Sequence, residues 1–218
     1  MYVFQLCLGE SLGGLNAAAA GYIAVIALMV ALGRIRGFSL GVYGAPVRFF
    51  VAAAMIGVAA WYVDLRIVER LAPPSEGSNL QQVVTTSALG ASLLALAILP
   101  AIAEELVFRG VLARALAAHS AALAVLVSAL VFSLYHLNPS QMLGTFPLGL
   151  ALGVLVVRSG SVVPGMITHL LNNAIVLVLA HVDVPSVDLL LARHGNAALV
   201  GASVLVLGGV MIAAKGVA

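Results

Sequence analysis

The feature that most constrains this chain is a series of long apolar runs, several of them close to 20 residues in length. A helix of about 20 apolar residues crosses the hydrocarbon core of a bilayer. Only 8% of the 218 residues are charged and 63% are hydrophobic, whereas a soluble domain carries about 25% charged residues. The runs also lack the alternating pattern of an outer-membrane barrel. We therefore predict an all-α, polytopic transmembrane helical bundle, a multi-pass protein of the cell membrane, with the Ala- and Gly-rich composition of a bacterial inner or plasma membrane protein.

Turn signals and charged residues divide the apolar runs into about eight segments. The segments are expected at residues 15–33, 46–63, 82–99, 101–118, 120–137, 141–157, 162–181 and 197–214. Breaks are predicted near Pro100, near His119 and within 137–140, 158–161 and 183–196, and residues 71–79, with paired prolines, form the clearest loop. The sequence shows no internal repeat, so residues 1–218 are predicted to form a single integral membrane domain.

Bulk charge and cysteine content exclude several kinds of partner. A formal net charge of +2, without any basic run, argues against a nucleic-acid partner. The single cysteine, Cys7, excludes an intramolecular disulfide and a cysteine-based metal site. The expected partners are therefore membrane lipid and a membrane-associated molecule.

The distribution of arginines leaves the orientation in the membrane open. Arg34, Arg36 and Arg48 follow the first apolar run, and the positive-inside rule places such a cluster in the cytoplasm. Arg114 and Arg158 fit that placement only if the segment at 101–118 enters and leaves on one side.

Three ionisable residues lie inside an apolar segment rather than at its ends. Glu104, Glu105 and Arg109 fall within two helical turns, and each charge at mid-bilayer costs about 2.5–3.5 kcal/mol on insertion scales. Glu105 and Arg109 have the i,i+4 spacing of a salt bridge, which is a structural interpretation of that pair. Glu104 points about 100° away from Glu105 on a helix and finds no partner within its own segment. We therefore expect its partner on another helix.

Two later segments carry suitable partners. His136 ends an apolar run and, taken alone, is typical of an interfacial residue. His169 and Asn173 lie one turn apart in a third apolar segment, where His and Asn often serve only to join helices. If residues 101–118 and 120–137 form a hairpin, Glu104 lies level with His136, and His169 and Asn173 can complete the cluster.

A carboxylate with two imidazoles is the set of groups that activates water. Glu104 can take a proton from water directly, or Glu104, His136 and His169 can hold a divalent metal such as zinc. His169 and Asn173 can alternatively donate hydrogen bonds to a developing oxyanion. All three schemes are hydrolytic.

The three segments follow a family pattern. Residues 104–109 read EExxxR, residues 132–136 read FxxxH and residues 169–173 read HxxxN, in that order and within hydrophobic segments. This set resembles the CPBP intramembrane protease family, also called the Abi family, which includes type II CAAX prenyl endopeptidases and bacterial relatives linked to bacteriocin self-immunity and peptide processing. The resemblance covers about residues 80–182.

The resemblance implies an intramembrane endopeptidase, glutamate-dependent or metal-dependent, that acts on a membrane-associated peptide or protein. Glu104 and His136 would act on the attacking water, and His169 and Asn173 would stabilise the oxyanion. Glu105 and Arg109 would support these groups, with Phe132 as a packing residue.

Two other functions compete with this interpretation. One is a non-catalytic bacteriocin-immunity or scaffold protein of the same fold. Gly149 and Gly153, in a GxxxG spacing, can dock a partner helix or pack within the fold. The other is a proton relay or transporter, which usually shows paired repeats. The motifs HExxH, GxSG and GxGD, which mark other intramembrane proteases, do not occur.

Overall fold

A computed structural model describes residues 13–72, 87–182 and 185–215, and within these ranges helices are the only regular secondary structure. The elements in chain order are α2 (Gly14–Arg36), α3 (Val47–Leu71), α5 (Leu89–Leu93), η1 (Leu94–Ile98), α6 (Leu99–Glu104), η2 (Glu105–Ala113), α7 (Arg114–Ala117), α8 (Ala121–Tyr135), α9 (Pro139–Ser159), α10 (Val163–His181) and α11 (Pro185–Ala214). The segments η1 and η2 are π-helical and follow directly on their α-helical neighbours. The elements from α5 to α7 therefore form one continuous helix. The predicted all-α bundle is confirmed.

Six of the described helices are long and apolar enough to cross a membrane. Leu89–Ala117 counts as one of them, so the predicted break at Pro100 was wrong. The prediction of about eight segments was approximate, because two of them form this single helix. Pro100 lies inside the helix, at the start of α6, directly after the η1 turn. Helix α8 has only 15 residues and spans about 22 Å, less than the hydrocarbon core of about 30 Å.

The observed boundaries of two other helices differ from those predicted from the sequence. Helix α3 continues to Leu71, past the charged residues where the sequence predicted an end, and Arg66 pairs with Glu69 at 2.7 Å on its surface. Helix α11 begins before the predicted segment and is kinked at His194, whose φ of −128° is not helical. Of the loop predicted at 71–79, all but residues 71 and 72 lies outside the described residues.

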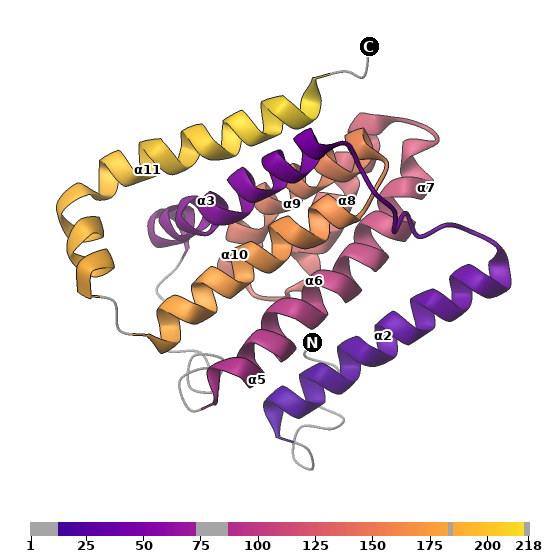
Figure 1. The fold of residues 1–218 in the computed structure, drawn as a ribbon, viewed down its shortest axis with the longest axis horizontal. Coiled ribbons are helices and arrows are strands. Elements are labelled where there is room, and N and C mark those ends of the chain that lie inside the picture. Colours follow the sequence, from indigo (N-terminus) through magenta and orange to yellow (C-terminus); the bar gives the residue numbers. More distant parts are fainter. Residues whose placement is uncertain (1–12, 73–86, 183–184, 216–218) are drawn as a thin grey trace.

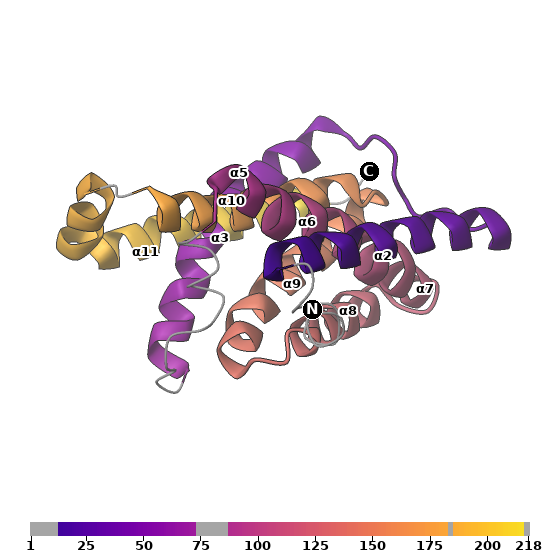
Figure 2. The same ribbon diagram turned by 90° about the horizontal axis from the view of Figure 1, so that it is seen from below.

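The helices form a bundle around α3 and α9. Figures 1 and 2 show α11 and α2 at opposite edges, with α11 packed on α3 and α9 and with α2 beside α6 and η1. The main core joins side chains of α3, α9 and α11, and includes Phe49, Ile56, Leu152, Leu155 and Ala213. Large apolar side chains such as Leu126, Val204 and Leu207 point outward, as lipid-facing positions of a membrane protein do.

Helices η2–α7 and α8 form the predicted antiparallel hairpin. Phe108 of η2 meets Phe132 of α8 edge to face, with ring centroids 5.4 Å apart. Glu104 lies one turn before Phe108, and His136 lies one turn after Phe132. In an antiparallel pair both therefore lie on the same side of this contact, as predicted.

The small-residue face of α9 packs inside the bundle. A Cβ atom on Gly149 would lie 3.1 Å from the Cα of Ala129, and one on Gly153 would lie 3.2 Å from the Cα of Val125. Both glycines therefore allow α8 and α9 to approach closely, so that of the two roles considered for them the structure shows packing within the fold.

Candidate active site

The two glutamates lie in the middle of the helix from Leu89 to Ala117, at the junction between α6 and η2. Both are buried, with 5% of Glu104 and none of Glu105 exposed. Residues 105–113 form a π-helical turn, a distortion that often occurs at functional sites. Because the two side chains are almost completely buried, protein groups must compensate for most of their lost solvation.

Glu105 is neutralised as the sequence predicted. The Nη1 atom of Arg109 donates to Glu105 Oε1 at 2.9 Å, and both side chains are fully buried. The Nη2 atom of Arg109 donates to the Gly149 carbonyl at 3.1 Å, and the guanidinium lies 4.4 Å from the centre of the Phe132 ring. Arg109 thus fixes Glu105 relative to both α8 and α9.

His169 lies between the two carboxylates. Its Nδ1 is 3.2 Å from Glu105 Oε1, and its Nε2 is 3.8 Å from Glu104 Oε2. An ionised carboxylate only accepts hydrogen bonds, so Nδ1 carries the proton in the contact with Glu105. The contact with Glu105 orients the ring and leaves Nε2 facing Glu104. The sequence placed His169 near Glu104 but did not reveal that Glu105 orients it.

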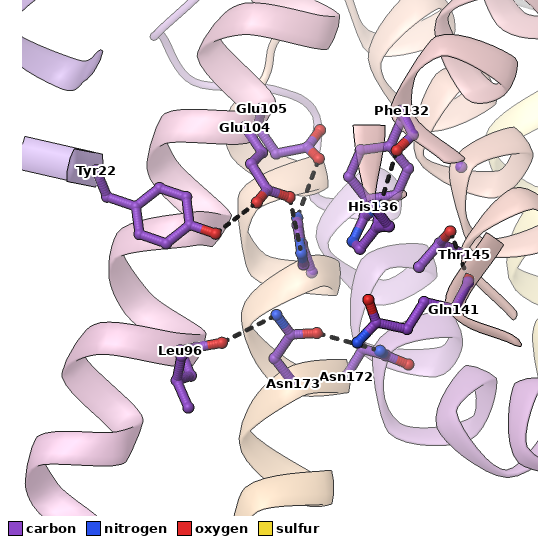
Figure 3. A network of polar contacts seen from close by, with 12 residues as sticks. Tyr22, Leu96, Glu104, Glu105, Phe132, His136, Gln141, Thr145, Asn172 and Asn173 are labelled. Atoms are coloured by element: carbon purple, nitrogen blue, oxygen red, sulfur yellow. Dashed lines mark hydrogen bonds and ion pairs between the residues drawn. The ribbon is translucent and has the colours of Figure 1, made fainter. Parts of the chain in front are cut away.

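Tyr22 of α2 is the site residue that the sequence analysis missed. Its hydroxyl donates to Glu104 Oε1 at 2.9 Å, and the side chain is buried. Figure 3 shows the tyrosine approaching Glu104 from a separate helix. A signal was present: between Ala17 and Gly33, Tyr22 is the only side chain with a hydroxyl, amide or charged group.

Phe132 joins the three motifs. Its ring meets His136 and His169 edge to face, with centroid distances of 5.1 and 5.6 Å. The Nδ1 atom of His136 lies 2.9 Å from the Phe132 carbonyl, and the imidazole also meets the ring of Tyr135. The predicted packing role of Phe132 is therefore visible in these contacts, and the contacts found for His136 in the described residues run through Phe132 and Tyr135.

Asn173 reaches a backbone group of another helix. Its Nδ2 donates to the Leu96 carbonyl at 3.2 Å, and its Oδ1 accepts from Nδ2 of Asn172 at 3.4 Å. Pro100 has no N–H, so the Leu96 carbonyl lacks its α-helical donor four residues later, and Asn173 supplies one. Figure 3 shows Asn172, Asn173 and Gln141 below the glutamates and His136, around the same part of the bundle.

The donor set does not fit a metal centre. Within the described ranges, no group of three or more His, Cys, Asp or Glu side chains is arranged to hold a metal ion. Glu104 and His169 face each other, but His136 does not join them as a third ligand. The ligand set predicted for zinc is therefore not assembled, and the chemistry derived below uses the side chains alone.

Fold and site together define a class of protein: a multi-pass helical membrane protein with a buried carboxylate–imidazole cluster. Residues 86–175 match the family model described as Type II CAAX prenyl endopeptidase Rce1-like. All three motifs fall within this segment, so the match confirms the resemblance to the CAAX-protease-like family that the motifs predicted. The family is one of membrane proteases, so it indicates a hydrolase. No curated protein and no solved structure matches the chain.

Proposed function

We propose that the chain is an intramembrane endopeptidase that hydrolyses a peptide bond in a membrane-associated peptide or protein. The observation that carries the proposal is the facing pair of Glu104 Oε2 and His169 Nε2, 3.8 Å apart and buried. A general base and a hydrogen-bond donor placed side by side can serve the two oxygens of the reaction, those of the attacking water and of the substrate carbonyl.

In the proposed reaction Glu104 is the general base. Its carboxylate takes a proton from water while the water oxygen attacks the carbonyl carbon of the scissile bond. The resulting tetrahedral intermediate carries a negative oxygen. When the C–N bond breaks, the proton passes from Glu104 to the leaving amine, so that the carboxylate is regenerated. His136 is assigned to the same water, from the end of α8.

His169 and Asn173 are assigned to the oxyanion. In its imidazolium form, His169 donates through Nδ1 to Glu105 and has Nε2–H for the substrate. The Asn173 amide has two hydrogens, of which one is used by the Leu96 carbonyl, so a second donor remains. Glu105 and Arg109 support the reaction through His169, because they hold its ring in place.

The substrate is assigned by chemical class. The family description names prenyl endopeptidases, and a prenyl group is an apolar lipid. A cluster buried among transmembrane helices suits a peptide that is itself held at the membrane. We therefore assign a membrane-associated peptide, with or without a prenyl group.

The test compares purified wild type and Glu104→Gln in proteoliposomes. Fluorogenic peptides with and without a farnesylated cysteine serve as substrates, and Glu69→Gln, at a helix end and paired with Arg66, is the matched control. We expect wild type and Glu69→Gln to cleave at least one peptide and Glu104→Gln to lose about 100-fold or more of the rate. Equal cleavage by wild type and Glu104→Gln would contradict the proposal, and absence of cleavage by wild type would favour a scaffold or immunity role.

A further inference from the structure

The first described helix contributes to the cluster although it lies outside the segment that matches the family. Helix α2 precedes residues 86–175 and lies at the edge of the bundle, where it packs on η1, α6 and η2 (Figure 1). Its buried residues are Ala17, Ala18, Gly21, Tyr22 and Gly33. Four of these five are small, so α2 can approach α6 closely while Tyr22 projects from that face.

The contact that Tyr22 makes distinguishes the two oxygens of Glu104. The tyrosine hydroxyl donates to Oε1 at 2.9 Å, whereas Oε2 faces His169 Nε2 at 3.8 Å. The second distance is too long for a direct hydrogen bond. One oxygen is therefore held firmly, and the other keeps lone pairs for a further donor.

We propose that Tyr22 is a positioning residue for the reaction: it holds Glu104 Oε1, so that Oε2 is the atom that takes the proton from water. This inference rests on the proposed function. A glutamate side chain has three rotatable bonds, and a hydrogen bond to an ionised acceptor is among the stronger ones in proteins. Fixing one oxygen keeps the other in a reactive geometry beside His169. The active unit therefore includes α2 as well as the matched segment.

The test uses Tyr22→Phe, with Tyr62→Phe as the matched control. Tyr62 is also buried, and its hydroxyl donates to the Gly195 carbonyl at 3.1 Å, between α3 and α11. In proteoliposomes we expect Tyr22→Phe to lower kcat about 10-fold with KM changed less than about twofold, as for loss of a hydrogen bond to a charged group. Tyr62→Phe is expected to keep both constants.

A second comparison separates positioning from a general loss of structure. In a Glu104→Ala background the hydroxyl has no carboxylate to hold, so Tyr22→Phe is expected to cause no further loss of the residual rate. Incorporation of para-aminophenylalanine at position 22 keeps a donor of similar reach, and we expect it to restore most of kcat. This variant also serves if Tyr22→Phe folds poorly.

The outcomes distinguish this inference from the function on which it rests. If wild type cleaves, Glu104→Gln does not and Tyr22→Phe keeps the wild-type kcat, only the role of Tyr22 is overturned. The same holds if Tyr22→Phe lowers the rate equally in the Glu104→Ala background. If wild type and Glu104→Gln behave alike, the proposed function falls, and the role of Tyr22 falls with it.

Discussion

At the scale of single residues, the environment of Glu105 shows how a charge is kept inside the bundle. Besides Arg109 and His169, the carboxylate lies against Gly165 in the first turn of α10, since a Cβ there would be 2.8 Å from Glu105 Oε2. The positive end of a helix dipole stabilises a nearby anion. Glu105 Oε2 accepts no hydrogen bond from the described residues. The start of α10 therefore stabilises the negative charge on this oxygen where no hydrogen bond does.

We predict that Gly165→Ala destabilises the protein. The added methyl group would meet Glu105 Oε2 at 2.8 Å and Val156 Cγ2 at 3.0 Å, so that the buried ion pair or the helix must shift, at a cost of about 1–3 kcal/mol. Gly201→Ala in α11 is the control, because nothing lies within 4 Å of its Cβ position. Thermal unfolding in detergent is expected to show a lower Tm for Gly165→Ala and an unchanged or slightly higher Tm for Gly201→Ala. Equal Tm values for wild type and Gly165→Ala would contradict the prediction.

The partner of Glu105 could be predicted from the sequence, whereas the hydrogen-bond donor of Glu104 could not. The Glu105–Arg109 pair followed from i,i+4 spacing and is confirmed. Glu104 required a partner on another helix, yet its hydrogen-bond donor, Tyr22, lies 82 positions away. An isolated tyrosine in an apolar helix is typical of an interfacial residue as well, so its type alone does not reveal which helix it faces.

At the scale of elements, the helix from Leu89 to Ala117 continues through a proline. A proline inside a helix removes one hydrogen bond and clashes with the carbonyl four residues earlier. The π-helical turn η1 directly before α6 gives the backbone extra room, and Asn173 supplies the donor that Leu96 lacks. The predicted break at Pro100 was wrong because that donor comes from a helix 77 residues further along, which no local pattern shows.

We predict that Asn173 and Pro100 are coupled in stability. Asn173→Leu leaves the Leu96 carbonyl without this donor and is expected to destabilise the protein by about 1 kcal/mol. In a Pro100→Ala background, residue 100 has an N–H that can bond the same carbonyl, so Asn173→Leu is expected to cost less. Thermal unfolding of the four proteins of this double-mutant cycle measures the coupling.

Catalytic loss does not enter that comparison, because stability is measured without substrate. Asn172→Leu is the control, since the Asn172 amide donates to Asn173 and not to the backbone of η1. Strictly additive effects of Asn173→Leu and Pro100→Ala would contradict the coupling.

At the scale of the whole molecule, the described helices alternate in direction, so the basic residues can be assigned to two ends. The guanidinium of Arg114 donates to Tyr43 and to the Gly160 carbonyl, and that of Arg158 donates to the Ala214 carbonyl. These contacts join the connection between α2 and α3 to α7 and to the end of α9, and they join the end of α9 to the end of α11. The basic residues at this end are Arg34, Arg36, Arg48, Arg114, Arg158 and Lys215.

The opposite end carries fewer basic residues and some acidic ones. Arg66 and Arg70 lie there at the end of α3, with Glu69 between them, and α8 ends there at His136. The orientation could not be predicted from the sequence, because two segments were expected where Leu89–Ala117 form a single helix. Once these residues form a single crossing, Arg114 and Arg158 fall at the same end as the cluster after α2.

This distribution predicts the orientation of the protein in the membrane. The positive-inside rule places the end that carries Arg114 in the cytoplasm, so that the His136 end of α8 faces the other side. In a Cys7→Ser background, His119→Cys and Leu71→Cys put one thiol at an exposed position at each end, and neither change alters the arginine pattern. A membrane-impermeant maleimide is expected to label Leu71→Cys in intact cells and His119→Cys only after lysis. Labelling of His119→Cys alone in intact cells would indicate the opposite orientation. The substrate would then reach the His136 end of the cluster from the cytoplasm.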